Sequence, residues 1–201
     1  MKYDFSDVRE HLFEDLRSAY PTKWEDFEAA KVLGEGVFGS PKPHPNAVLN
    51  LFVAQSVRFA IPFAAYRASL DFPALISDKP GTVLPRLTLA STIYGMEKSR
   101  SLMIQVACTI VHTEHLPDCT NRACVLNVGT TPMKRRTEAM AKLHDVMISH
   151  REGGVLTPPS LGDIACAKCT KAIEAAHAIR RRAFWEMLPI IFLVAKCWDE
   201  V

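Results

Sequence analysis

The sequence predicts an all-α fold, an irregular helical bundle with long loops that a structural zinc site would pin. Apolar residues recur at helical spacing in most segments, whereas the alternation that marks a half-buried strand is scarce. Proline-rich stretches separate these segments. Hydrophobic residues make up 48% of the 201 residues and charged residues 23%, as in ordinary globular chains. Together these observations favour packed helices joined by irregular loops.

Two short helices are predicted within residues 1–33. Residues 6–16 place apolar side chains on one stripe, and Tyr20-Pro21 should end this helix. Thr22 and Glu25 form a capping-box pattern for the second helix. The stripe of the first helix comprises Phe5, Val8, Leu12, Phe13 and Leu16.

A Gly- and Pro-rich connector follows at residues 34–45. The spacing of Gly34, Gly36 and Gly39 is similar to that of the phosphate-covering loop of a protein kinase. A kinase would continue with a strand that carries a phosphate-pairing lysine, and later with HRD and DFG motifs, none of which occurs in this sequence. We therefore interpret the glycines as a helix C-cap and an irregular connector. No catalytic constellation emerges elsewhere, and we predict that the protein is not an enzyme.

Residues 46–201 are predicted to form one helical C-terminal domain. Its first helix should cover residues 46–60, and Pro62 should break or bend it before a helix at residues 63–70. Residues 71–86 are rich in proline and should form a loop.

Three further helices are expected in this domain. One covers residues 87–111 and should be interrupted near Gly95. Thr131-Pro132 gives the signal for a second helix. The last long helix should be capped by Ser160 or Asp163 and end at Pro189. Its inward stripe is predicted to comprise Cys169, Ala172, Ala176, Ile179, Ala183 and Met187.

Four of the six cysteines are spaced as two metal-binding pairs. Cys119 and Cys124 are separated by four residues in a turn-like stretch, and Cys166 and Cys169 by two residues at the start of the last helix. Zinc binds four ligands in a tetrahedron and takes thiolates readily, so two close pairs beside turns predict one structural zinc site. The alternative is four ordinary buried thiols, because free cysteine packs well in cores.

The neighbouring cysteines and histidines are weaker candidates. Cys108 and Cys197 stand in apolar surroundings, which predicts core positions. His112 and His115 could join a mixed site with the cysteines, but they also suit a helix end, which is the interpretation we favour.

Two basic clusters, Lys134-Arg135-Arg136 and Arg180-Arg181-Arg182, could contact phosphate. Each has only three charges, the formal net charge is +2, and no aromatic residues are interleaved for base stacking. We interpret both as solvated helix faces, which disfavours nucleic acid as a partner. No stretch approaches the roughly twenty apolar residues of a membrane span. The N-terminus lacks an apolar signal core, so we expect no membrane association and an intracellular location, in cytoplasm or nucleus.

Several blocks carry a family resemblance. "KYDFSDVREHL", from Lys2, resembles the helix that closes a BTB/POZ domain. "AYPTKWEDFE", "HPNAVLNLFVAQSVRFAIPFAAYRASL" and the ending "CAKCTKAIEAAHAIRRRAFWEMLPIIFLVAKCWDEV" resemble the helical region that follows this domain in basidiomycete fungal BTB/POZ domain-containing proteins. The strand-rich BTB core should precede Lys2 and is absent from the sequence, which is expected for a truncated gene model, an alternative start or a degenerate paralogue.

The resemblance implies a non-enzymatic adaptor or scaffold, because BTB proteins dimerise and present partners to ubiquitin ligases or transcriptional complexes. Residues 1–33 would then correspond to the end of the BTB domain and its extension. We expect a protein partner, whose identity the sequence does not give. The alternative function is a zinc-stabilised nucleic-acid-associated or transcription-related module that uses the two basic clusters.

Overall fold

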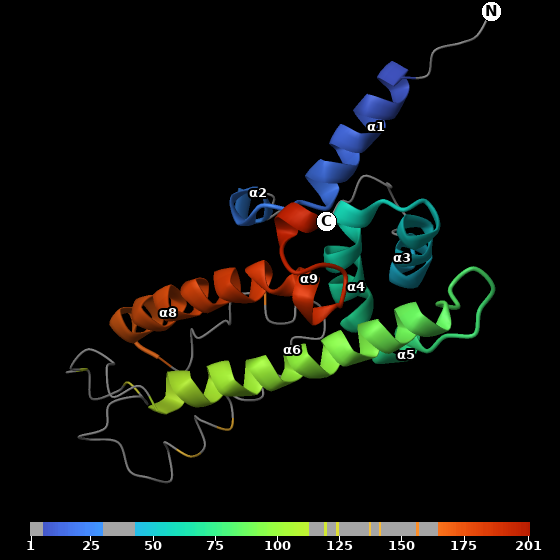
Figure 1. The fold of residues 1–201 in the computed structure, drawn as a ribbon. Helices are drawn as coiled ribbons and strands as arrows, with labels where there is room; N and C mark the ends of the chain where they lie inside the picture. Colours follow the sequence, from blue (N-terminus) through green and yellow to red (C-terminus); the bar gives the residue numbers. More distant parts are fainter. Residues whose placement is uncertain are drawn as a thin grey trace, which may run out of the picture. The chain divides into compact units, whose positions relative to one another are not determined.

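The computed structural model describes residues 6–29, 43–112 and 165–201, together with five single positions, namely Cys119, Cys124, Thr137, Ala141 and Leu156. Every regular element in these residues is helical, with eight α-helices, two 3-10 helices and no strand (Figure 1). The predicted all-α class is therefore confirmed. None of the described helices has the length and apolar character needed to cross a bilayer.

The chain divides into two compact units. The first unit combines Met1–Met96 with Glu186–Val201, and the second is Glu97–Trp185. The ends of the chain thus contribute to one unit, and the candidate metal ligands all fall in the other.

Several predicted features lie outside the described residues. They are most of the connector at 34–45, the end of the second predicted helix at residues 30–33, the basic cluster at 134–136, His115, and the side chains of Val8, Cys108 and His112. Of the helix predicted from Thr131-Pro132, only Thr137 and Ala141 are described, and both are helical.

Helix α1 (Ser6–Ala19) ends directly before Tyr20-Pro21, as predicted, and α2 (Trp24–Ala29) follows. The Phe13 ring lies 6.2 Å from the Phe59 ring, and the Arg17 guanidinium lies 5.5 Å above the same ring. Leu12 is 57% exposed, so the predicted stripe is not buried along its whole length.

An aromatic cluster forms the core of the first unit around α3 (Pro45–Ala54) and α4 (Ile61–Ser69). The Tyr20 ring meets the Phe52 ring edge-on at 4.8 Å, and the Phe63 ring lies 6.0 Å from Tyr20 and 5.7 Å from Phe27. Edge-to-face contacts of this kind add to the free energy gained by burying each ring. The cluster fastens the chain after α1 to the α3–α4 pair.

The break between α3 and α4 lies earlier than predicted. Helix α3 ends at Ala54, Ser56 has a left-handed φ of 54°, and a 3-10 turn, η1 (Arg58–Ala60), leads into α4. Pro62 lies in the first turn of α4 rather than breaking a helix. A proline is compatible with this position because first-turn N–H groups have no partner within the helix.

The segment predicted as a loop at 71–86 contains a short helix, α5 (Phe72–Leu75), capped by the Asp71 carboxylate, which accepts from the Ala74 N–H at 3.1 Å. Asn46 is fully buried, and its Nδ2 donates to the carbonyls of Ala74, Leu75 and Thr82 at 2.9, 3.1 and 3.1 Å. One buried amide therefore fixes the course of the segment over α3.

Helix α6 (Arg86–His112) continues through Gly95, so the predicted interruption is wrong. The Phe192 ring, which follows α9 (Leu188–Ile191), lies directly against Gly95, where any Cβ would collide with it. Glycine is therefore needed for this contact rather than for a bend. Pro189 lies in the first turn of α9, and a final 3-10 turn, η3 (Trp198–Glu200), follows.

In the second unit, α8 (Ala167–Glu186) begins later than predicted. Cys166 is not helical, and its carbonyl accepts from the Thr170 N–H at 2.8 Å, so Cys166 rather than Ser160 or Asp163 precedes the first turn. The predicted inward stripe is also wrong beyond Cys169, since Ile179 is 72% exposed. Besides Cys169, the buried residues of α8 are Ile173, His177, Arg181, Phe184 and Trp185.

Candidate metal centre

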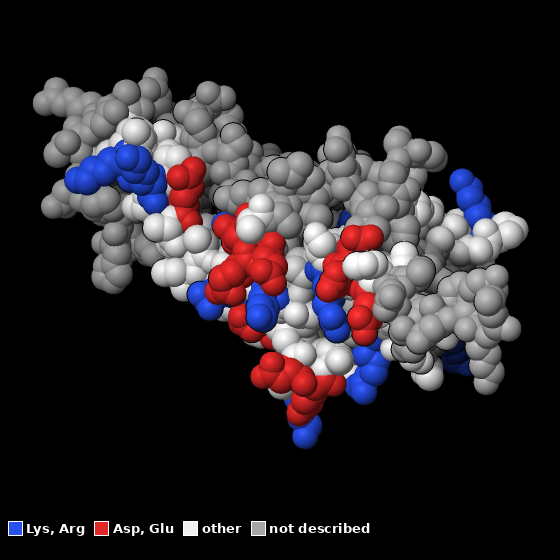
Figure 2. All heavy atoms as spheres, turned by 90° about the horizontal axis from the view of Figure 1, so that it is seen from above, with Lys and Arg blue, Asp and Glu red and all other residues white. Residues whose placement is uncertain are grey.

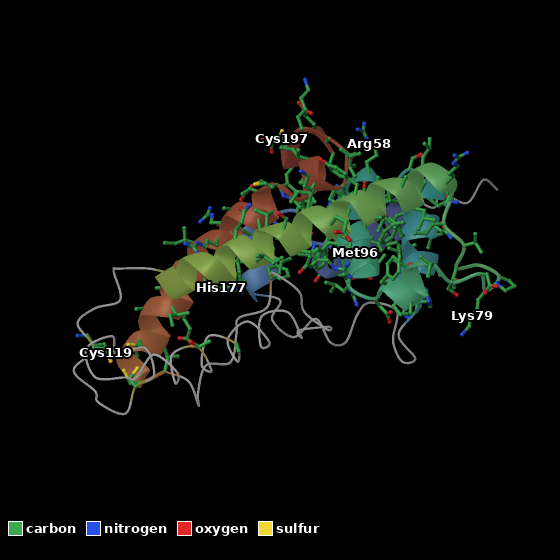
Figure 3. The ribbon with its side chains drawn as sticks, turned by 90° about the horizontal axis from the view of Figure 1, so that it is seen from below. Arg58, Lys79, Met96, Cys119, His177 and Cys197 are labelled. Carbon is green, nitrogen blue, oxygen red and sulfur yellow. The ribbon has the colours of Figure 1, made fainter. Side chains whose placement is uncertain are left out.

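The two cysteine pairs meet at the beginning of α8. The sulfurs of Cys119, Cys124, Cys166 and Cys169 all lie within 4.8 Å of one another. Cys169 belongs to the first turn of α8, Cys166 directly precedes it, and Cys119 lies beside this end of the helix (Figure 3). The structure thus brings together all four residues that the spacing predicted, and these four could bind a metal ion such as zinc.

The spacing of the sulfurs suits a single tetrahedral ion. Cys119 Sγ lies 3.7 Å from Cys166 Sγ, although the two residues are 47 positions apart in the sequence. With a zinc–sulfur bond of about 2.3 Å, two ligands of a tetrahedral site lie about 3.8 Å apart. The 3.7 Å separation therefore matches the edge of such a tetrahedron.

Local backbone structure positions the sulfurs. The Cys166 N–H donates to Cys124 Sγ at 3.3 Å, so the residue before α8 holds a sulfur of the other pair. Backbone N–H groups that point at sulfur are frequent partners of thiolate ligands because they stabilise negative charge. Cys124 and Cys169 are buried, whereas Cys119 and Cys166 are half-buried. The centre therefore has a closed side and a side nearer to solvent.

The two cysteines at the start of α8, Cys166 before it and Cys169 within it, have opposite pKa shifts. The Cys169 backbone N–H stabilises the Cys166 thiolate and is the largest of the effects that lower the pKa of Cys166, from 9.0 to about 7. Burial raises the pKa of Cys169 far above its usual value, and the neighbouring thiols raise it further. A bound cation would instead lower the pKa of Cys169, since coordination deprotonates a thiol outright.

Of the other candidates from the sequence, Cys197 has a described side chain, and it does not belong to this centre. Cys197 is exposed, so its predicted core position is wrong. It lies between the short helix α9 and η3, where its backbone is extended, and its apolar neighbours in sequence do not bury it. Among the described residues, no second group of three or more His, Cys, Asp or Glu side chains converges in the same way.

The second basic cluster is not a uniform solvated face. Arg181 is 5% exposed, and its Nη1 donates to the Leu156 carbonyl at 3.0 Å. Arg182 is exposed and Arg180 half-buried, so the three side chains do not present one surface. On the face shown in Figure 2, described Lys and Arg side chains stand beside Asp and Glu side chains and form no continuous basic surface.

Comparison with known proteins adds no relative. No family model, no curated protein and no solved structure matches this chain.

Proposed function

We propose that the chain is a non-enzymatic protein-interaction module, an adaptor or scaffold, whose second unit is stabilised by a structural zinc ion. The convergence of four cysteine sulfurs within 4.8 Å carries the zinc half of this proposal. The adaptor half follows the resemblance to the helical region after fungal BTB/POZ domains, and exposed apolar residues of the first unit support it.

The donor set favours zinc among the common metals. Four thiolates in a tetrahedron are typical of zinc and of iron–sulfur proteins, whereas magnesium and calcium take oxygen ligands. An iron–sulfur cluster would place several iron and sulfide atoms between the thiolates and would hold them further apart than one ion does. Sulfurs that are all within 4.8 Å of one another suit the single ion.

Four protein ligands leave no open coordination position, so the ion would be structural rather than catalytic. It would join the segment that carries Cys119 and Cys124 to the start of α8, and so close a loop between two cysteines that are 47 positions apart in the sequence. The free energy of binding such an ion becomes free energy of folding when the ligands are assembled only in the folded chain.

Exposed apolar side chains on the first unit offer an interaction surface. Leu51 is 49% exposed, Val83 57% and Leu87 84%. Asn50, the neighbour of Leu51 in α3, donates from Nδ2 to the Val83 carbonyl at 2.8 Å, which holds the Val83 segment along α3. Contiguous exposed apolar side chains are a frequent feature of protein-binding surfaces, and we propose that these three side chains belong to one such surface.

The zinc half is tested by the metal content of the purified chain. We expect about one zinc per chain, and loss of that zinc in Cys169→Ser, because the remaining three thiolates leave one tetrahedral position unfilled. Cys197→Ser is the matched control, since Cys197 is exposed and lies in the other unit. A chain that is purified reduced and folded but holds no zinc would contradict this half.

The adaptor half is tested by comparing the proteins that co-purify with the parent chain and with two surface variants. Leu87→Asp places a charge on the proposed surface, and Ile179→Asp places one at a 72% exposed position of the second unit. A partner lost only with Leu87→Asp supports the proposal, and equal recovery with all three chains contradicts it. Nucleic acid would instead be recognised by binding that weakens steeply with added salt.

A further inference from the structure

The cysteines of the candidate metal centre fall into two pairs by exposure. Cys119 and Cys166, here called the outer pair, are half-buried, whereas Cys124 and Cys169, the inner pair, are 3% and 0% exposed. The two outer sulfurs also lie 3.7 Å apart, close enough to touch each other. The two more exposed cysteines of the centre therefore have adjacent sulfurs and come from different segments.

We propose that this centre is an oxidant-responsive site, in which a peroxide joins the outer pair in a Cys119–Cys166 disulfide and releases the metal. The inference rests on the proposed function for the resident zinc, and it assigns to the same ion a regulatory role in addition to the structural one.

The reaction consumes one peroxide and two protons for each disulfide. One outer thiolate attacks a peroxide oxygen, the O–O bond breaks, and a sulfenic acid forms while the second oxygen leaves as water after taking up a proton. The other outer thiolate then attacks the sulfenic sulfur, the S–O bond breaks, and its oxygen leaves as water with a second proton. The two sulfurs together lose the two electrons that reduce the peroxide. Two thiolates then remain for the metal, too few to hold it in a closed site.

Backbone structure favours this pairing over the alternatives. A disulfide needs its sulfurs about 2.05 Å apart, so the outer sulfurs must approach each other from their 3.7 Å separation. Neither Cys119 nor Cys166 is part of a helix, which leaves their backbones freer to make this movement. The competing C-x2-C pairing uses Cys169, which is fully buried in the first turn of α8. An oxidant from solvent therefore meets the outer pair first.

The new bond would replace the metal as the connection between the two segments. It joins the same Cys119 segment to the same start of α8 that the ion would hold, so the local course of the chain is kept while the ion is lost. Reduction of the disulfide would restore the thiolates and allow the zinc to return. The switch is thus reversible, unlike oxidation of a single thiol to a sulfinic acid.

The experiment uses the zinc-loaded full chain carrying Cys197→Ser, because Cys197 is exposed and could form bonds between molecules. Zinc is measured before peroxide, which tests the proposed function on its own. Zinc release during peroxide treatment is followed with a chromogenic chelator, and the disulfide is mapped by mass spectrometry. Trypsin cleaves after Arg122 and Lys168, which places the four site cysteines in separate peptides. Cleavage after Glu114 separates Cys119 from Cys108.

We expect release of about one zinc per chain in step with a Cys119–Cys166 linkage, and rebinding after addition of a thiol reductant. Release with a Cys166–Cys169 or Cys119–Cys124 linkage would overturn the inference, as would retention of zinc when the peroxide has oxidised all exposed thiols. If the purified chain holds no zinc, both the proposed function and the proposed zinc release are wrong. The disulfide map of that chain would still show whether Cys119 pairs with Cys166.

Cys119→His supplies a second, independent readout. Histidine is an ordinary zinc ligand, so this variant keeps four donors but lacks one sulfur of the outer pair. We expect it to hold zinc, to release it several-fold more slowly with peroxide, and not to regain it on reduction. Equal and reversible release from this variant would contradict the inference. If the variant fails to bind zinc, the linkage map of the parent chain decides.

Discussion

The sulfurs of Cys119 and Cys166 lie 3.7 Å apart, although the two residues are 47 positions apart in the sequence. Two neutral thiols at this distance can share one S–H···S hydrogen bond, but that weak contact does not account for four sulfurs within 4.8 Å of one another. A divalent ion would account for it because all four sulfurs then bind as thiolates. The arrangement is therefore better explained by a ligand set than by ordinary core packing of thiols.

Removal of zinc is expected to lower the thermal stability of the chain. A loss of about 3 kcal/mol would lower the Tm of a protein of this size by roughly 10 °C, and structural zinc commonly supplies more than that. Thermal unfolding followed by circular dichroism, with and without a strong chelator, measures the change. Cys169→Ser should already melt lower and should not respond to the chelator. A parent chain whose Tm is the same with and without chelator would contradict the zinc site.

The cysteine cluster was predictable from the sequence because each pair is close in the chain. Local spacing alone placed Cys119 with Cys124 and Cys166 with Cys169, and the tetrahedral preference of zinc then joined the pairs. Nothing in the spacing indicates which sulfurs face solvent, since that depends on where α8 begins. The predicted start at Ser160 or Asp163 would have placed Cys166 inside the helix, whereas it precedes Ala167.

The buried face of α8 was not predictable from hydrophobicity. A stripe drawn through apolar residues points to Ile179, which is 72% exposed, and misses His177 and Arg181, which are 4% and 5% exposed. A charged side chain can be buried when it finds a partner such as the Leu156 carbonyl, which lies 25 residues earlier in the chain. A single sequence does not show that partner. The apolar residues alone therefore predicted the wrong face of α8 as the buried one.

Replacing Arg181 should destabilise the chain far more than replacing its neighbour. Arg181→Met keeps most of the aliphatic volume but removes the donor to the Leu156 carbonyl, and a hydrogen bond from a charged group contributes about 1.5–3 kcal/mol. Arg182→Met is the matched control at an exposed position, where substitutions usually change stability by less than about 0.5 kcal/mol. Urea unfolding of both variants measures the difference. Equal unfolding midpoints would show that the buried hydrogen bond contributes nothing.

Gly95→Ala should destabilise the first unit, although alanine is the better helix former by about 1 kcal/mol. The added Cβ would collide with the Phe192 ring, which must move out of its packed position. Overpacking of this kind typically costs about 1–3 kcal/mol.

A double-mutant cycle with Phe192→Ala isolates the contact between Gly95 and Phe192. In the Phe192→Ala background there is no ring to collide with, so Gly95→Ala should become neutral or stabilising. The free energies of unfolding of the four chains, measured in urea, give the coupling. A destabilisation by Gly95→Ala that is the same in both backgrounds would mean that the ring is not its cause.

The pKa of Tyr20 predicts a loss of stability at high pH. Burial raises the pKa of Tyr20 above 10.0, although the nearby Arg67 opposes this shift. The unfolded chain therefore ionises this phenol at a lower pH than the folded chain does. Below about pH 10 both states are protonated and the contribution of Tyr20 is intact, whereas above it ionisation favours the unfolded state until the folded pKa is passed.

Tyr20→Phe is expected to remove this alkaline loss. Phenylalanine keeps the ring that meets Phe52 edge-on at 4.8 Å but cannot ionise. The free energy of unfolding of both chains, measured in urea between pH 8 and pH 11, should run in parallel up to about pH 10 and then fall more steeply for the parent. Tyr94→Phe is the control, since Tyr94 is 45% exposed. Above pH 10 the free energy of unfolding of this control should fall as it does for the parent chain. If the parent chain and Tyr20→Phe also lose stability equally above pH 10, burial of the Tyr20 phenol has no effect on stability in this range.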